Sequence, residues 1–150
     1  MFSQTAEYAL RAIAHLAQNP ESPQTSQQIS AAMQVPLPYL SKVLQALGRA
    51  RLIQAQRGLH GGFTLLKSPK ELTVYEVIQV VDPMKRIKTC PLGLAAHGTN
   101  LCPLHRRLDD AMAQVEKTFR DTTIAEILEE PAGLPELASA HAGNQPPRIE

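Results

Sequence analysis

The fold of this chain is decided by residues 26–66, which read SQQISAAMQVPLPYLSKVLQALGRARLIQAQRGLHGGFTLL. Apolar residues recur at helical spacing over 26–33 and again over 38–49, and the segment 34–36 (QVP) separates the two. Pro38 suits the first turn of the second helix, where its missing N–H has no acceptor to lose. Two short helices joined by a tight turn predict a helix-turn-helix.

A β-hairpin is expected directly after these two helices. Strand-like segments at 52–56 and 63–66 flank the glycine-rich segment 57–62 (RGLHGG). Glycine allows positive φ there and lets the hairpin tip approach a phosphate backbone closely. We therefore predict a mainly α fold: a winged helix-turn-helix with a small β-hairpin wing and a long C-terminal dimerisation helix.

The same rules divide the whole chain into four segments. Further helices are expected at 3–18, 73–81, 104–120 and 124–128. The expected segments are a winged helix-turn-helix DNA-binding domain (1–81), a cofactor-binding loop (82–103), a dimerisation helix with a short cap helix (104–130) and a disordered tail rich in Pro, Gly and Ala (131–150).

Length and composition narrow the class of protein. A chain of 150 residues forms one domain, with or without an appended dimerising segment. It has no run of about 18 apolar residues, and Glu7 interrupts the apolar stretch that a signal peptide would need. We expect a cytoplasmic protein with no membrane partner. In that reducing compartment, Cys90 and Cys102 are expected to be thiols or metal ligands and not a structural disulfide.

Charge is sorted along the chain, although the formal net charge is only +1. Residues 22–70 contain no Asp or Glu, and their cations are Lys42, Arg49, Arg51, Arg57, Lys67 and Lys70. A positive surface without carboxylates to cancel it suits a polyanion. Because this segment contains the helix-turn-helix and the wing, we predict binding to double-stranded DNA.

The helix at 38–49 should bury one face and present the other to DNA. Its apolar stripe is Leu40, Val43, Leu44 and Leu47. The predicted DNA contacts are Tyr39, Ser41, Lys42, Gln45 and Arg49 on this helix, with Arg57, Gly58 and His60 in the wing. We expect Ser41 and Gln45 to read base edges in the major groove. Arg57 should enter or flank the minor groove, where a guanidinium suits the negative potential.

A second amphipathic helix at 104–120 follows the winged domain. Its apolar stripe is Leu108, Met112, Val115 and Phe119. Such a helix has little core of its own chain left to bury against, so we predict that it pairs with its copy in a homodimer. Two winged domains would then bind a pseudo-palindromic operator. The alternative is a helix that folds back on its own domain.

Several motifs in order carry a resemblance to a known family. They are Tyr8-Ala9-Leu10-Arg11-Ala12, Tyr39-Leu40, Arg57-Gly58, Gly61-Gly62-Phe63, Thr73-Val74-Tyr75-Glu76-Val77-Ile78 and Thr123-Ile124-Ala125-Glu126-Ile127. Over about residues 1–130 the chain resembles the BadM/Rrf-two family of bacterial regulators. The resemblance implies a homodimeric winged-helix transcription factor, most often a repressor, whose affinity for DNA depends on an iron–sulfur cluster.

The resemblance also implies a set of ligands. The family commonly has three cysteines at six-residue steps and, in some members, a histidine three residues later. Cys90, Cys102 and His105 match the first, third and histidine positions, but Ala96 occupies the middle one. His97 is the reserve candidate for that place. Glu7 matches an acidic ligand that the first helix supplies, across the dimer in some members.

The chemistry of these donors favours a 2Fe-2S cluster. Two thiolates with nitrogen or oxygen donors can hold two irons, and histidine in place of cysteine on one iron raises the reduction potential, as in Rieske centres. A four-iron site is harder to build without a third cysteine. Sensing of redox state, iron or nitric oxide would follow.

Three other readings of Cys90 and Cys102 stay open. The two cysteines could form a disulfide on oxidation, or hold zinc. The chain could also be a clusterless regulator controlled by a protein or a small molecule. An enzyme built on Cys102 and His105 would need a third orienting group and an oxyanion site. The sequence shows no Gly-flanked nucleophile turn and no phosphate loop, so we expect no enzymatic activity.

Overall fold

The computed structural model of the protein describes residues 3–90, 92–94 and 100–129. Within these ranges, the elements in chain order are α1 (Gln4–Gln18), α2 (Ser26–Met33), α3 (Leu37–Arg49), β1 (Ile53–Gln56), β2 (Gly62–Leu65), α4 (Val74–Val81), α5 (Pro103–Asp121) and α6 (Ile124–Leu128). The predicted winged helix-turn-helix with a long C-terminal helix is confirmed. Residues 131–150, together with Ala96 and His97, lie outside the described ranges.

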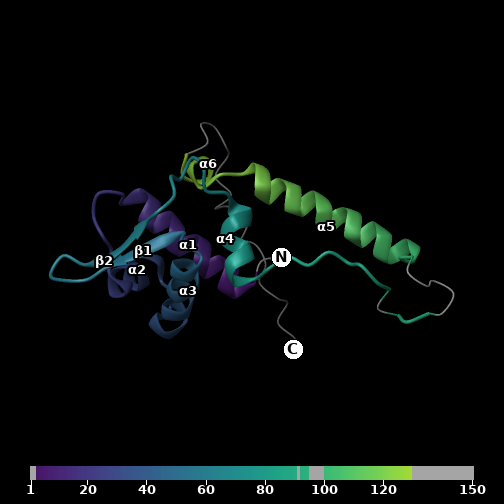
Figure 1. Ribbon diagram of the computed structural model, residues 1–150, viewed down its shortest axis with the longest axis horizontal. Coiled ribbons are helices and arrows are strands. Elements are labelled where there is room, and N and C mark those ends of the chain that lie inside the picture. Colours follow the sequence, from purple (N-terminus) through teal and green to yellow (C-terminus); the bar gives the residue numbers. More distant parts are fainter. Residues whose placement is uncertain (1–2, 91, 95–99, 130–150) are drawn as a thin grey trace, which may run out of the picture.

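The core forms around α1, which runs through the middle of the molecule and packs against α2, α3, α4 and α6 (Figure 1). Its buried face includes Ile13 and Leu16, and the predicted stripe of α3 (Leu40, Val43, Leu44 and Leu47) is buried against it. Full burial of one such side chain stabilises the fold by about 1.5–3 kcal/mol. This shared core fixes the orientation of α3, so its opposite face has a defined direction.

The turn between α2 and α3 has its own local hydrogen bonds. Thr25 and Gln28 form a capping box at the start of α2. The helix ends at Gln34, which adopts a left-handed conformation with φ of 54°, and Ser30 Oγ donates to the carbonyl of Val35 at 2.6 Å. α3 begins at Leu37, one residue earlier than predicted, with Pro38 in its first turn.

The wing is a two-stranded antiparallel hairpin in which Ile53 pairs with Leu65 and Gln56 pairs with Gly62. β1 begins one residue later than predicted, and β2 has the predicted length but begins and ends one residue earlier. The hairpin is also tied to the segment before α2, because Gln24 and Phe63 exchange backbone hydrogen bonds of 3.0 and 2.8 Å. Gly62 permits this contact, since a Cβ atom there would lie 2.6 Å from the carbonyl carbon of Gln24.

α4 and α6 are held together although they are distant in sequence. Thr73 and Glu76 form the predicted capping box of α4, and Thr123 and Glu126 form a second one at the start of α6. Thr73 and Thr123 form a β-bridge. Ile124 is buried in the same core as α1 and α3, so α6 packs as part of the winged body.

α5 leaves this body as an arm, and the chain between α4 and α5 runs out beside it (Figure 1). Its C-terminal end packs on the body through Phe119, which contacts a small cluster of Ala6, Val74 and Ile78. Toward its N-terminal end, Leu104 and Leu108 are 60% and 46% exposed. Folding back, the alternative considered from the sequence, therefore applies to the last turns of α5. Among the described residues, no helix has the length and apolarity needed to cross a bilayer.

Candidate nucleic-acid interface and metal centre

The outer face of α3 and the wing form one exposed polar surface. Tyr39, Lys42, Gln45 and Arg49 are exposed on α3, and Arg57, Gly58 and His60 are exposed in the hairpin turn. Ser41 is half-buried, and its hydroxyl donates to the carbonyl of Leu37 at 2.9 Å, which leaves its oxygen lone pairs as acceptors. The structure therefore brings all the predicted DNA contacts to two adjoining elements.

A groove of about 370 Å³ separates α3 from the hairpin. Ser41 and Gln45 line it from the helix, and Ala55 and Phe63 line it from the strands. Gly58 has φ of +111°, a conformation that suits glycine and turns the chain at the wing tip. The groove and the tip give the surface a helix and a hairpin that can contact two neighbouring parts of one duplex.

The cations of this surface are not neutralised. In the described part of the chain, the ion pairs are Arg11–Glu7, Lys67–Glu76, Arg86–Asp109, Lys117–Asp121 and Arg120–Glu116. Lys42, Arg49 and Arg57 take part in none of these pairs. Their charge is therefore available to phosphates, and each contact would release counterions from DNA.

α3 is linked to α1 by an aromatic pair. The rings of Tyr8 on α1 and Tyr39 on α3 are 6.4 Å apart between centroids and tilted by 51°. Tyr8 follows Glu7 directly in α1. A displacement of α1 would therefore also move Tyr39 on the exposed side of α3.

Three potential metal ligands converge at the start of α5. Donor atoms of Cys90, Cys102 and His105 all lie within 4.8 Å of one another. His105 Nδ1 is 2.9 Å from Cys102 Sγ and 3.6 Å from Cys90 Sγ. Cys102 and His105 are 7% and 9% exposed, and Cys90 is half-buried, so Cys90 is the most accessible of the three ligands. Two sulfurs and an imidazole suit iron, an iron–sulfur cluster or zinc, and the three residues fit such a group.

Helix geometry explains two of the three positions. Cys102 is the N-cap of α5, and Pro103 starts the helix, so His105 falls on the first turn above it. The pKa of the Cys102 thiol lies below its ordinary value, chiefly because the backbone N–H of His105 donates to it, with a further bond from the Cys90 thiol. A lower thiol pKa increases the fraction of thiolate, which is the form that binds metals.

Glu7 lies apart from this group within one chain. Its carboxylate pairs with Arg11 at 3.3 Å, and its side chain is 53% exposed. The three-ligand group of the described residues does not include it. A role for Glu7 as a ligand therefore requires a second copy of the chain, and His97 lies outside the described residues.

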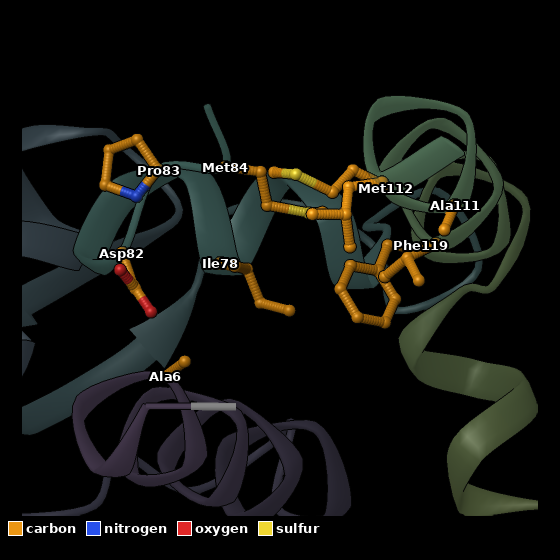
Figure 2. Close-up of a pocket in the computed structure, with 10 residues that line it drawn as sticks. Ala6, Ile78, Asp82, Pro83, Met84, Ala111, Met112 and Phe119 are labelled. Atoms are coloured by element: carbon orange, nitrogen blue, oxygen red, sulfur yellow. The ribbon is translucent and has the colours of Figure 1, made fainter. Parts of the chain in front are cut away.

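The predicted dimer stripe lines an apolar cavity. Leu108, Met112, Val115 and Phe119 border a space of about 350 Å³ between α5, α4 and the start of α1. Figure 2 shows Met84 and Met112 together with Phe119 across from Ile78. The cavity gives the helix a partly open apolar side, and the pairing of two copies stays a prediction.

The sequence reading missed two contacts that shape these sites. Gln24, which anchors Phe63, is an ordinary polar residue with no local signal. Asp109 accepts hydrogen bonds from Arg86 and from the backbone N–H of Ile87, which lie more than 20 residues earlier in the chain. An Arg and an Asp at such a distance in sequence give no pattern, so neither contact could be expected from spacing.

A winged helix with an exposed, unneutralised reading face is the architecture of a helix-turn-helix transcriptional regulator. The sequence model of the Rrf2 family, described as an iron-dependent transcriptional regulator, matches residues 2–130. The chain belongs to this family, which confirms the resemblance seen in its motifs. Family members are regulators of transcription and not enzymes.

Individual relatives agree with this assignment. The HTH-type transcriptional regulator NsrR of Geobacillus kaustophilus (strain HTA426) is 31% identical over 143 residues, which span 91% of this chain and 95% of that protein. The structure of T. potens IscR is similar with a TM-score of 0.71 at 22% identity, covering 85% of each chain. CymR, the global cysteine regulator of B. subtilis, has a TM-score of 0.71 at 20% identity, covering 85% of this chain and 95% of that one.

Proposed function

We propose that this protein is a homodimeric, DNA-binding repressor of the cytoplasm whose operator affinity is set by a 2Fe-2S cluster. Cys90, Cys102 and His105 would hold the cluster in one protomer, and Glu7 of the other protomer would complete it. The observation that carries the proposal is the convergence of two thiols and an imidazole within 4.8 Å in a member of a family described as iron-dependent.

DNA binding would use α3 and the wing in different ways. Tyr39, Ser41 and Gln45 would contact base edges in the major groove, where hydroxyl and amide groups discriminate between base pairs. Lys42 and Arg49 would neutralise phosphates, and Arg57, with Gly58 and His60 at the tip, would lie in or beside the minor groove. The unpaired cations of this surface support the assignment.

Dimerisation would bury the open side of α5. Leu108 is 46% exposed and borders the cavity with Met112, Val115 and Phe119. A second copy of α5 is the natural occupant, because a two-fold axis presents the same stripe from both sides. The pair of winged domains would then read a pseudo-palindrome with half-sites one or more helical turns apart.

When bound, a cluster supplies reversible electron transfer and an iron that other ligands can approach. The chain's own residues connect this site to the reading head. Glu7 precedes Tyr8 on α1, and Tyr8 packs against Tyr39 of α3. A change at Glu7 would therefore be passed through one helix and one aromatic contact to the DNA-facing surface.

A second candidate keeps the fold and replaces the cluster with a thiol switch or a zinc ion. One observation favours it: three donors lie within 4.8 Å of one another, which suits a single tetrahedral ion. Two close thiols, with the pKa of Cys102 below its ordinary value because of hydrogen bonds, also suit oxidation to a disulfide. The similar fold of the global cysteine regulator is compatible with this candidate.

Anaerobic reconstitution with iron and sulfide separates the two candidates. We expect a brown protein with about two irons per chain and the Mössbauer signature of a 2Fe-2S cluster. Cys90→Ser and Cys102→Ser should abolish the colour, whereas His105→Ala and Glu7→Gln should leave a labile or spectrally shifted cluster. His60→Ala, a histidine in the wing, is the matched control and should retain the wild-type spectrum.

A wild-type protein that stays colourless would remove the cluster and favour the thiol or zinc candidate. Operator binding by the apo and reconstituted forms, compared at one salt concentration, would then show which state binds DNA more tightly.

A further inference from the structure

Asp109 joins α5 to the chain that leads to Cys90 through three hydrogen bonds. Its Oδ1 accepts from Arg86 Nε at 2.7 Å and from the backbone N–H of Ile87 at 3.0 Å, and its Oδ2 accepts from Arg86 Nη2 at 2.6 Å. The Asp109 side chain is 16% exposed and that of Arg86 is 41% exposed. A two-pronged contact between guanidinium and carboxylate fixes orientation as well as distance.

The position of this contact relates it to the candidate metal centre. Asp109 lies one helical turn after His105 on α5, and Ile87 lies three residues before Cys90. The contact therefore joins the two segments that carry the ligands, close to the ligands on both sides. We name the contacts of Asp109 with Arg86 and Ile87 the Asp109 clamp.

We propose that the Asp109 clamp is a positioning device that holds Cys90 beside Cys102 and His105. This inference rests on the proposed function in assuming that the three residues act together as a site. Arg86 and Asp109 do not contact a metal in this arrangement. They act through the backbone that leads to Cys90.

Chain length gives the expected size of the effect. Before the clamp, the chain is last anchored at Met84, which packs against the cluster of Ala6, Val74 and Ile78. With the clamp in place, Ile87 is the last fixed residue before Cys90. The length of chain between the last fixed residue and Cys90 therefore falls from six residues to three. Since effective concentration falls as about the −3/2 power of the length of a flexible linker, the clamp should raise the concentration of the Cys90 thiol at Cys102 by about threefold.

Other contacts of Cys90 with the start of α5 are made by its side chain, including the hydrogen bond of its thiol to Cys102, whereas the clamp fixes the backbone that leads to it. Gly93 donates its backbone N–H to the carbonyl of Cys90 at 3.2 Å, which closes a local turn and does not reach α5. Cys90 and His105 are 3.6 Å apart between Sγ and Nδ1, a long contact that depends on where Cys90 is held. Loss of the clamp should therefore lower the affinity for a metal by about tenfold, the lower end of the range for residues that support ligands.

Asp110 provides a matched control for Asp109. The two aspartates are neighbours on α5, but Asp110 is exposed and is no partner in the hydrogen bonds of Arg86 or Ile87. Asp109→Asn and Asp110→Asn change the net charge equally, and only the first removes the charged fork. Arg86→Gln removes the same fork from the other side and serves as the second variant if Asp109→Asn does not fold.

Two measurements on the full-length apo protein test the clamp. In the first, the protein is equilibrated with glutathione buffers, and the Cys90–Cys102 disulfide is quantified by alkylation and mass spectrometry. The two thiols lose two electrons and two protons, and glutathione disulfide is reduced to two glutathione molecules. In the second, Co²⁺ is titrated and followed by its thiolate charge-transfer absorption.

We expect Asp109→Asn and Arg86→Gln to lower the effective thiol concentration by about threefold and the Co²⁺ affinity by about tenfold, with Asp110→Asn equal to wild type. Equal values for all four proteins, or an equal loss in Asp110→Asn, would overturn the inference. Neither measurement requires a cluster. A colourless reconstitution would therefore end the iron–sulfur proposal and leave the clamp to be decided by these two titrations.

Discussion

The winged body and the α5 arm differ in what they leave unpaired. In the body, the apolar faces of α1 and α3 are buried against each other, whereas Lys42, Arg49 and Arg57 have no carboxylate partner among the ion pairs of the described residues. On α5 the exposed groups include large apolar side chains. Lys117 and Arg120 pair with Asp121 and Glu116 in its last turns, while Leu104 and Leu108 are exposed near its start.

This contrast indicates two different partners for the two regions. Unpaired cations on a rigid body attract a polyanion, and phosphate contacts of this kind dominate affinity for DNA. An apolar stripe that is partly exposed on a helix is suited to another apolar surface. The cations of the body therefore predict DNA as its partner, and the apolar stripe of α5 predicts another apolar surface as its partner.

The largest expected effect comes from adding charge to the arm. Leu108→Asp combined with Val115→Asp should place carboxylates in the apolar stripe and produce a monomer, because a buried unpaired charge is costly. A monomer loses simultaneous binding to two half-sites, so operator affinity should fall by about a hundredfold or more. Sedimentation and operator titration measure the two effects.

Gln114→Asp is the control for the arm, since Gln114 is exposed and does not line the cavity. It should leave a dimer with wild-type affinity. A wild-type protein that sediments as a monomer at micromolar concentration would contradict the dimer and would assign the open side of α5 to some other occupant.

A smaller effect should follow from removing single cations from the body. Lys42→Ala and Arg57→Ala should each weaken operator binding by about tenfold and reduce the slope of log affinity against log salt by about one. Lys42→Ala should weaken all sequences alike, whereas Gln45→Ala should change the sequence preference. Titrations at several salt concentrations separate these outcomes.

Lys117→Ala is the matched control on the arm, where the lysine is paired with Asp121. It should leave the salt dependence unchanged. If Lys42→Ala and Arg57→Ala also leave it unchanged, the body does not dock on DNA through α3 and the wing.

The smallest expected effect concerns the carboxylate that caps α4. Burial would raise the pKa of Glu76, but hydrogen bonds from Lys67 and Thr73 outweigh it, so the pKa lies below its ordinary value. Its stabilising contribution is therefore present above the pKa of an unfolded glutamate and is lost as pH falls through the lower, folded value. Glu76→Gln should cost about 0.5–1 kcal/mol at neutral pH and nothing in acid.

Denaturant titrations at neutral and acidic pH give this difference in unfolding free energy. Glu71→Gln is the control, because Glu71 is exposed beyond the end of the wing and outside the capping box. An equal loss in both variants, or a loss in Glu76→Gln that persists in acid, would show that the capping hydrogen bonds do not depend on the charge.

Patterns among neighbouring residues were sufficient to predict most elements of the winged body. The stripe of α3, the capping box of Thr73 and Glu76, and the glycine turn of the wing each depend on residues within one or two turns of each other. Errors in the body were confined to the ends of elements, where α3 begins one residue early, β1 begins one residue late and β2 is shifted by one residue. Such ends depend on capping and fraying, which spacing describes poorly.

The candidate metal centre was only partly accessible from sequence. The spacing of Cys102 and His105 places them on one turn of a helix, which is a local fact. Cys90 joins them through a loop, and its approach to His105 depends on contacts made elsewhere, including the Asp109 clamp. The family resemblance indicated Cys90 as a candidate ligand. Only the fold showed that its sulfur lies close to His105.

The sequence by itself determined the helix-turn-helix, the wing, the acid-free reading face and the amphipathic stripe of α5, because periodicity, capping and charge are properties of neighbouring residues. Tertiary structure alone decided the bridges Gln24–Phe63 and Thr73–Thr123 and the joining of Arg86 to Asp109. It also decided that Glu7 lies apart from the thiols of its own chain. These contacts join residues far apart in the chain, and they form only because packing of the core brings their elements together at a cost in loop entropy that no local pattern records.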